Sequence, residues 1–301
     1  MQNIRVAIVG WGNVGRYCKY VIDETADMEL AGVVRRASSL SVVDADLEDV
    51  TVVSDIKELG KIDVALVCVP SRLAGDKVVQ LLEQGISTVD SFDIHDQIIE
   101  TKKRLDKIAK SNSAVSILGA GWDPGSDSVV RCLMQIVCPH ALTTTTFGGQ
   151  NGGRSMGHTA AVKAIAGVKD AVSLTLPNGA GLQKRLVYVA LEEGADFTQI
   201  ADLIRQDAYF INDPTDVVAV NDVSKYDTLN HGGEIERRYD DILQRYQVEG
   251  INPLMTANVL VSSARAAYRA KISEQFGAYT MIERPLVDFI AGSLEDQLKG
   301  Y

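Results

Sequence analysis

The chain has 301 residues, and its 30 Lys and Arg against 40 Asp and Glu give a formal net charge of −10. About two domains are expected at this length. A content of 46% hydrophobic and 23% charged residues excludes wholesale disorder. The acidic balance argues against nucleic acid or an anionic membrane as the main partner, because both need a basic surface. We therefore expect a small-molecule ligand, no nucleic acid and no membrane.

Targeting signals and a metal site are not expected. The first residues, MQNIRVAIVGWGNVG, lead directly into a predicted strand rather than a signal peptide, and no run of about 18 apolar residues follows anywhere. The four cysteines are scattered, and Cys132 and Cys138 lie six positions apart, which fits no common zinc site. We interpret all four as buried thiols of a cytoplasmic protein.

The first 120 residues alternate between predicted strands and predicted helices. Residues 64–69 (VALVCV) are continuously apolar, which is typical of a parallel strand buried on both faces. In chain order we predict strands at 4–9, 28–34, 64–69, 87–89 and 115–118, with helices at 13–24, 73–84 and 95–111. This alternation predicts an α/β domain with a doubly wound parallel sheet of the Rossmann type.

The pattern changes from about Thr143 onward. Alternating β-branched residues predict strands at 143–147, 173–176 and 185–190, with a glycine-rich loop at 148–157 and a helix near 158–166. These elements favour a second, α+β domain with a largely antiparallel open sheet. A long Ala-rich helix is predicted at 258–269. We place one domain at 1–120, with 253–301 packing back on it, and the other at 121–252.

A G-x-G-x-x-G motif follows the first predicted strand and opens the first predicted helix. Its residues are Gly10, Trp11, Gly12, Asn13, Val14 and Gly15. In this context the motif predicts a dinucleotide site, with the pyrophosphate at the helix N-terminus. A glycine turn without a ligand is the alternative.

The end of the second predicted strand indicates which dinucleotide is bound. An NAD-binding protein usually carries Asp or Glu there to bind the ribose 2′-hydroxyl, whereas this chain has Arg35, Arg36 and Ser38. Arginine matches a phosphate in geometry and charge, so we predict NADP(H); a solvated basic pair is the alternative. Further cofactor contacts are expected from residues at or just after the ends of later strands, namely Cys68, Val69, Pro70, Ser71 and Ser91.

Two segments with acidic residues follow strands of the same predicted sheet. One is 90–95 (DSFDIH), with Asp90 and Asp93, and the other is 121–125 (GWDPG), with Asp123. Both should lie at the carboxyl edge of the sheet, where open α/β sheets bind ligands. Two acids there suit a cationic amine substrate or acid/base catalysis. Helix caps at Asp90 or Asp93 and a tight turn at Asp123 are the alternatives.

Several motifs together resemble the meso-diaminopimelate dehydrogenase family. They are VAIVGWGNVGR, VVRR, TVDSFDIH, AGWDPGSDS, SMGH, TLP, NHGG, INP and GAYTMIE, in order from residue 3 to about 283. The resemblance implies an NADP-dependent, homodimeric enzyme that reversibly deaminates the D-centre of meso-2,6-diaminopimelate to L-2-amino-6-oxopimelate (tetrahydrodipicolinate) and ammonia. It implies that 121–252 binds substrate and forms the dimer. The sequence resembles the broader-specificity branch of this family more closely than the strict branch. This suggests that the enzyme also aminates 2-keto acids to D-amino acids.

The resemblance also assigns roles to single residues. Asp93 and Asp123 would hold the amino group at the reacting D-carbon, and Trp122 would form the wall beside it. Met156 and Gly157 would belong to a loop that covers the substrate and offers backbone N–H groups to its carboxylate. Groups expected at the distant L-centre or elsewhere around the substrate are Phe147, Thr175, Arg185, His231 and Asn252.

Two departures from the family pattern weaken the expectation of strict selectivity. The glycine-rich stretch 148–154 is longer than expected, and Met156 stands where strict members carry a glutamine. Two other functions stay open: another Rossmann NAD(P)-dependent amino-acid dehydrogenase or reductase, such as a 2,4-diaminopentanoate dehydrogenase, and an NADP-binding sensor without catalysis.

Overall fold

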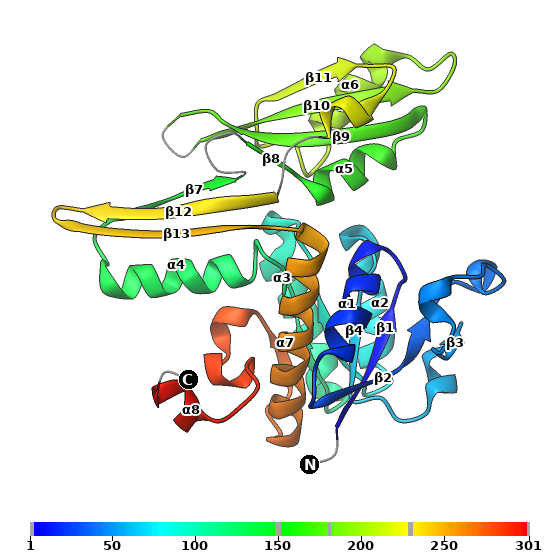
Figure 1. The fold of residues 1–301 in the computed structure, drawn as a ribbon, viewed down its shortest axis with the longest axis vertical. Helices are drawn as coiled ribbons and strands as arrows, with labels where there is room; N and C mark the ends of the chain where they lie inside the picture. The colour runs from blue at the N-terminus through cyan, green and yellow to red at the C-terminus, as the bar shows by residue number, and fades with distance from the viewer. Residues whose placement is uncertain (1–2, 148–151, 180–181, 228–230, 300–301) are drawn as a thin grey trace. The chain divides into compact units, whose positions relative to one another are not determined.

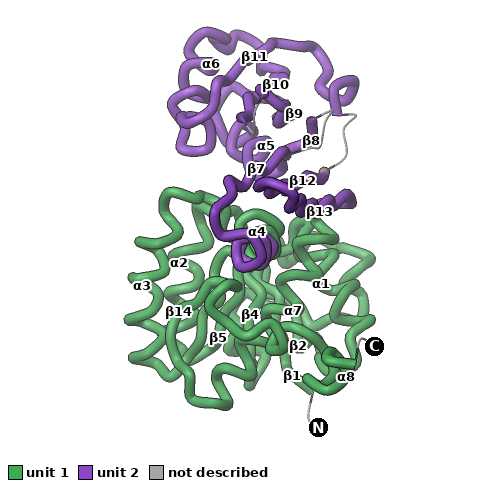
Figure 2. Tube along the Cα trace, turned by 90° about the vertical axis from the view of Figure 1, so that its left-hand side faces the viewer, with its two compact units in different colours: residues 1–129, 253–301 green, residues 130–252 purple. Residues whose placement is uncertain are grey.

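The chain forms two compact units, which Figure 2 colours separately. The structure, a computed structural model, describes residues 3–147, 152–179, 182–227 and 231–299, leaving aside the side chains of Phe147 and His231. Unit 1 comprises residues 1–129 and 253–301, and unit 2 comprises residues 130–252. Unit 1 extends beyond the expected boundary at 120/121, and Val129 near its end packs against the apolar core of this unit.

Unit 1 is built on a seven-stranded parallel sheet with the order β14-β6-β5-β4-β1-β2-β3. Figure 1 shows its strands beside the helices that flank them. The strands are β1 (Ile4–Val9), β2 (Met28–Val34), β3 (Val52–Val53), β4 (Val64–Val67), β5 (Ser87–Asp90), β6 (Val115–Ile117) and β14 (Gly277–Tyr279). The predicted doubly wound Rossmann sheet is confirmed.

Helices cover both faces of this sheet because alternate strand residues point to opposite faces. Ile4, Val6 and Ile8 of β1 share one apolar cluster with α1 and α7, while Ala7 and Val9 belong to the cluster formed with α2 and α3. These helices are α1 (Asn13–Asp23), α2 (Ser71–Leu82), α3 (Ile98–Ser111) and α7 (Asn252–Ile272), whereas α8 (Leu294–Lys299) has no buried residue. Helix α3 begins at Ile98 rather than at the predicted residue 95, because 95–97 form a 3₁₀ turn.

The C-terminal segment completes unit 1. Strand β14 extends the sheet beside β6, with Leu118 N donating to Tyr279 O at 3.0 Å. Helix α7 is held to the turn before β2 by Arg265, whose guanidinium donates to both carboxylate oxygens of Asp27 at 2.6 and 2.7 Å. The last part of the chain is therefore a structural component of unit 1.

Unit 2 contains two smaller sheets. The four-stranded sheet has the order β11-β10-β9-β8 and the three-stranded sheet the order β13-β12-β7. All pairings are antiparallel except β10 with β11, which confirms the predicted, largely antiparallel second domain. The strands are β7 (Leu142–Phe147), β8 (Gly153–Arg154), β9 (Val168–Pro177), β10 (Gln183–Leu191), β11 (Thr215–Ala219), β12 (His231–Tyr239) and β13 (Ile242–Gly250).

Two helices, α5 (Met156–Lys163) and α6 (Phe197–Gln206), pack on the four-stranded sheet of unit 2 through Val162, Ile200 and Ile204. Helix α4 (Ser126–Val137) crosses the boundary between the units in the sequence. The predicted loop at 148–157 is wrong for its second half, because β8 pairs with β9 and α5 starts at Met156.

Two remaining expectations concern membranes and cysteines. Among the helices described, none is long and apolar enough to cross a bilayer. The prediction of four buried cysteines is wrong for two of them: Cys18 and Cys138 are buried, whereas Cys68 and Cys132 are only half-buried. Cys68 directly follows β4, at the carboxyl edge of the sheet.

Candidate active site

The glycine motif has the geometry that a pyrophosphate requires. A Cβ on Gly15 would lie 2.4 Å from the Gly10 carbonyl oxygen, so this position must stay glycine for α1 to approach β1. Gly10 itself has φ +103°, whereas a Cβ on Gly12 would meet no atom within 4 Å. Gly12 caps α1, and the first turn contains no acidic residue. An open space thus faces the amide groups of a helix N-terminus, which suits a phosphate group.

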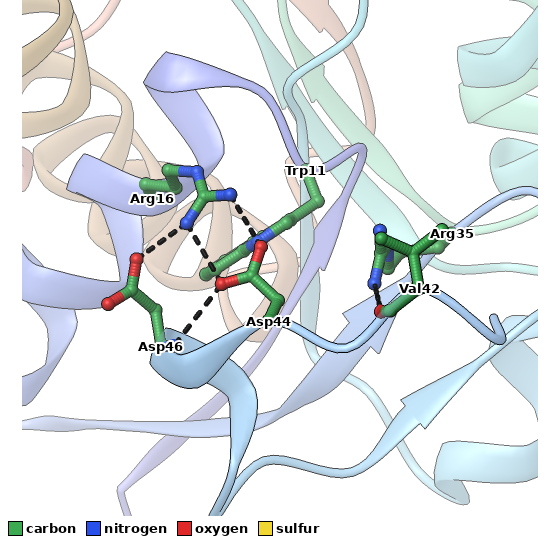
Figure 3. Close-up of polar contacts among 6 residues, drawn as sticks. All are labelled: Trp11, Arg16, Arg35, Val42, Asp44 and Asp46. Carbon is green, nitrogen blue, oxygen red and sulfur yellow. Dashed lines mark hydrogen bonds and ion pairs between the residues drawn. The ribbon is translucent and has the colours of Figure 1, made fainter. Parts of the chain in front are cut away.

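The loop after β2 is fastened to this motif by an ionic cluster (Figure 3). Asp44 accepts from the indole Nε1 of Trp11 at 2.8 Å and from Nη1 of Arg16 at 3.0 Å, and Arg16 also bonds Asp46 at 2.5 Å. The Arg16 guanidinium lies 5.3 Å from the centre of the Trp11 ring and holds the pKa of Asp44 below its ordinary value. The negative charge of Asp44, which lies next to the glycine motif, is therefore compensated by the positive charge of Arg16.

The predicted 2′-phosphate residues stand at the end of β2. Arg35 is half-buried and donates from Nη1 to the Val42 carbonyl at 3.1 Å, so it contacts the same loop as Trp11 does (Figure 3). Arg36 and Ser38 are exposed, around a short 3₁₀ turn that starts at Ala37. Two guanidinium groups and a hydroxyl can hold a phosphate here, and no carboxylate precedes them on the strand end.

The segment after β4 connects the predicted cofactor residues with the first acid. Cys68 N donates to Val9 O at 2.8 Å, and Pro70 caps α2. Ser71, predicted to contact cofactor, donates its hydroxyl to Asp93 Oδ1 at 2.7 Å and accepts from Asp93 N at 3.3 Å. Ser71 therefore positions the Asp93 carboxylate at the carboxyl edge of the sheet.

The second acid lies in a turn after β6. Asp123 has a side chain only 6% exposed and lies 3.7 Å from Nε2 of His95. Trp122 beside it is 6% exposed, and its carbonyl accepts from Asp127 N at 3.0 Å at the start of α4. His95 was expected to be a structural or capping residue, although the TVDSFDIH motif places it two residues after Asp93.

Asp90 joins the two segments that carry these acids. Its Oδ1 accepts from Phe92 N at 2.9 Å and from Gly119 N at 3.3 Å. Burial raises the pKa of Asp90 to about 6, although the two backbone N–H groups oppose the shift. The carboxyl group thus links the end of β5 to the end of β6. This arrangement supports a structural role for Asp90 and differs from the helix cap considered above.

Unit 2 brings two of the predicted L-centre residues together. Arg185 on β10 lies opposite Thr175 on β9 and donates to its hydroxyl. Arg185 also forms an ion pair with Asp213, with 2.7 Å between Nε and Oδ2. Burial lowers the pKa of Arg185, and Asp213 opposes that shift. Sequence reasoning missed Asp213, since it is 28 residues from Arg185 and meets it only through the pairing of β10 with β11.

The other predicted substrate residues are distributed over unit 2. Met156 and Gly157 form the first turn of α5 and not a loop, because Ser155 O accepts from Thr159 N at 3.1 Å. The first turn of a helix nevertheless leaves backbone N–H groups available to an anion. Asn252 is the first residue of α7. The side chains of Phe147 on β7 and His231 on β12 lie outside the described residues.

Two family models match the chain. "Oxidoreductase family, NAD-binding Rossmann fold" matches residues 4–90, and "Diaminopimelic acid dehydrogenase C-terminal domain" matches residues 121–186. The fold and the residues at its carboxyl edge thus define an oxidoreductase with a Rossmann nucleotide-binding unit.

Individual proteins and solved structures are similar over the full chain. The meso-diaminopimelate D-dehydrogenase of Bacteroides fragilis is 44% identical over 301 residues, covering 98% of each protein. That of Lysinibacillus sphaericus is 33% identical, covering 95% of each. Among structures, Corynebacterium glutamicum DAP dehydrogenase in complex with DAP has a TM-score of 0.85 at 28% identity, covering 100% of this chain and 99% of that one.

A second solved structure, an engineered D-amino acid dehydrogenase bound to NADP⁺, has a TM-score of 0.87 at 27% identity, covering 99% of each chain. The chain belongs to the meso-diaminopimelate D-dehydrogenase family. The family resemblance drawn from the motifs is thereby confirmed.

Proposed function

We propose that this protein is an NADP-dependent meso-2,6-diaminopimelate D-dehydrogenase. The D-centre would be oxidised reversibly to an imine, and water would hydrolyse this imine to the oxo group of L-2-amino-6-oxopimelate with release of ammonia. The observation that carries this proposal is the pair of acids, Asp93 and Asp123, held after neighbouring strands of a nucleotide-binding sheet in a chain of this family. The presence of these acids also favours an enzyme over an NADP-binding sensor.

The cofactor site of unit 1 fits NADP better than NAD. Gly12 and the N-terminus of α1 would hold the pyrophosphate, because open space and unpaired amide groups meet there. Arg35, Arg36 and Ser38 would hold the 2′-phosphate. When bound, the nicotinamide supplies the redox chemistry by accepting a hydride from the substrate α-carbon.

The two acids would bind the ammonium group at the reacting carbon. Ser71 fixes Asp93 by two hydrogen bonds, so little reorientation is needed when the substrate arrives. Asp123 is nearly buried, and a charge-assisted hydrogen bond to an ammonium is stronger in such surroundings than in water. One of these carboxylates would also accept the proton that the ammonium must lose, with Trp122 forming the wall beside it.

Residues of unit 2 would hold the L-centre. Arg185 can offer a bidentate contact to a carboxylate, and Thr175 fixes its guanidinium. We propose that Phe147, His231 and Asn252 also bind this part of the substrate, and that Met156 and Gly157 offer the backbone N–H groups of the α5 first turn. A side chain without hydrogen-bond donors at Met156 would tolerate varied substrates, including simple D-amino acids and the corresponding 2-keto acids.

A substrate panel tests the reaction. NADP⁺ reduction is measured with meso-, LL- and DD-diaminopimelate and with D- and L-alanine. We expect the meso compound to be the best substrate, D-alanine to react weakly, and the LL compound and L-alanine not to react. Reduction of NADP⁺ by L-alanine, or none with any diaminopimelate, would refute the proposal.

A matched pair of arginine variants tests the placement of the L-centre. Arg185→Ala should lower kcat/KM for meso-diaminopimelate at least tenfold more than for D-alanine, because only the former has a distal carboxylate. Arg205→Ala is the control, since Arg205 lies on the exposed side of α6 and pairs only with Asp202 among its described ionic partners. Equal losses on both substrates would contradict this placement.

We also propose that the protein is a cytoplasmic homodimer formed through unit 2. Apolar side chains are exposed on α4 and at the start of β7: Leu133 is 48% exposed, Ile136 78%, Val137 62% and Leu142 87%. Apolar side chains that stay exposed to water do not stabilise a monomer, whereas a second copy of the chain can bury this surface. Light scattering on Ile136→Asp should show a monomer, with unchanged circular dichroism, if this surface forms the dimer; an unchanged dimer mass would contradict it.

A further inference from the structure

The L-centre site of unit 2 already contains a carboxylate of the protein. Asp213 Oδ2 accepts from Arg185 Nε at 2.7 Å, and the two side chains are only 17% and 8% exposed. The Thr175 hydroxyl accepts from Nη1 of the same guanidinium. The positive charge of Arg185 is therefore compensated before any ligand binds.

Asp213 is fixed in this position by several contacts. Its two carboxylate oxygens accept from Gln183 Nε2 at 3.3 and 3.1 Å, and its N–H donates to Phe210 O at 3.0 Å. The next residue, Pro214, accepts from the backbone N–H of Arg185 at 2.8 Å. Because its backbone and its side chain are both bonded, Asp213 does not simply move away when a ligand approaches.

The guanidinium still has donors for a ligand. Arginine has five N–H groups, and Asp213 and Thr175 occupy Nε and one N–H of Nη1. Among the described residues, Nη2 has no hydrogen-bond partner. A distal carboxylate that binds there would share the guanidinium with the Asp213 carboxylate. Two like charges on one partly buried cation repel each other, so this carboxylate binds more weakly than it would to an unpaired arginine.

We propose that Asp213 is a specificity-determining residue that limits the affinity for substrates with a distal carboxylate. The inference rests on the proposed function, which places that carboxylate at Arg185. A simple D-amino acid has no distal carboxylate and never meets the repulsion. Asp213 therefore reduces the difference in affinity between diaminopimelate and simple D-amino acids. The enzyme accepts a broader range of substrates as a result.

Replacing the charge while keeping the hydrogen bond tests the proposal. In Asp213→Asn the side-chain oxygen still accepts from Arg185 Nε. Gln183, whose Oε1 is buried without a hydrogen-bond partner among the described residues, can turn its amide to accept from the new NH₂ group. We expect the KM for meso-diaminopimelate to fall at least fivefold, while the KM for D-alanine changes less than twofold.

The control variant is Asp216→Asn, on β11 near Asp213. Asp216 is 69% exposed and lies 3.9 Å from Lys184, so its loss should leave both KM values unchanged. A higher KM for meso-diaminopimelate in Asp213→Asn would show that the carboxylate orients Arg185 instead of competing with the ligand, and would overturn the proposal. A fall of less than fivefold, or an equal shift with both substrates, would overturn it too.

A measurement on the unmodified protein keeps the proposal testable if the variant does not fold. The distal monoamide of meso-diaminopimelate has the shape of the substrate but no distal charge. With Arg185 already compensated, we expect its KM to be less than tenfold above that of meso-diaminopimelate, whereas a ratio of tenfold or more would overturn the proposal. If the proposed function itself were wrong, the result would be different, because the unmodified protein would not oxidise meso-diaminopimelate at all.

Discussion

Replacing Asp90 with Asn should make the stability of unit 1 less dependent on pH. Asp90 is 2% exposed, and burial raises its pKa from 3.8 to about 6. Below pH 3.8 the carboxyl is protonated in both the folded and the unfolded chain, and its contribution to stability is fully present. As the pH rises through 6 that contribution is lost, because the folded protein must then hold a buried charge.

The size of the effect follows from the shift. A pKa difference of 6 − 3.8, at about 1.36 kcal/mol per pH unit, corresponds to about 3 kcal/mol in the free energy of unfolding. About 2 kcal/mol of this loss occurs between pH 4.5 and 8. Asn stays neutral and its oxygen can accept from Phe92 N and Gly119 N, so the variant should gain about 2 kcal/mol relative to wild type over that range.

Urea unfolding at several pH values measures this difference. The two tryptophans, Trp11 and Trp122, both belong to unit 1, so their fluorescence reports its unfolding. The new amide can also change the free energy of unfolding by an amount that is the same at every pH. This amount does not affect the result, because the test uses only the change with pH in the difference between variant and wild type. Asp76→Asn is the control, since Asp76 is 80% exposed. A difference that stays constant with pH, or that decreases, would refute the reasoning about Asp90.

Three further predictions concern the cofactor, the amine site and the C-terminal segment. Arg35→Ala with Arg36→Ala should weaken NADP⁺ binding at least tenfold and leave NAD⁺ binding unchanged in fluorescence titrations, because charge-assisted hydrogen bonds of about 1.5–3 kcal/mol are lost; a retained NADP⁺ preference would contradict the assignment. Asp123→Asn should lower kcat/KM for deamination at least tenfold with unchanged NADP⁺ affinity, and unchanged turnover would remove Asp123 from the site. Arg265→Met should lower the free energy of unfolding by about 2 kcal/mol, since Arg265 is buried while its partner Asp27 is 41% exposed; an unchanged urea midpoint would show that the pair contributes nothing.

The sequence predicted the nucleotide-binding half well because its signals are local. β1 (Ile4–Val9) and β2 (Met28–Val34) have the predicted bounds, since each is an apolar run closed by a glycine or by arginines. β3 (Val52–Val53) and β14 (Gly277–Tyr279) were missed because two or three residues show no periodicity. Their place in the sheet depends on pairing with β2 and β6, which no local pattern specifies.

Two other elements carry local signals in the sequence. Helix α7 begins at Asn252 rather than at residue 258, although Pro253 in the first turn is a common helix start. Helix α6 was missed, although Asp196 precedes it and accepts from Thr198 N and Gln199 N as an N-cap. The Arg185–Asp213 pair had no such signal, because it arises from the register of two strands.

The interrupted path of the chain through unit 1 has a consequence for how the protein is made. Unit 2 is one continuous stretch, 130–252, whereas one edge strand of the large sheet, β14, lies at Gly277–Tyr279. During translation the inserted unit can fold while the sheet around the glycine motif still lacks its last strand and α7, since domains fold as units from the N-terminal end. A premature stop codon after residue 252 would therefore leave every candidate cofactor residue in the polypeptide and still remove the scaffold that holds them.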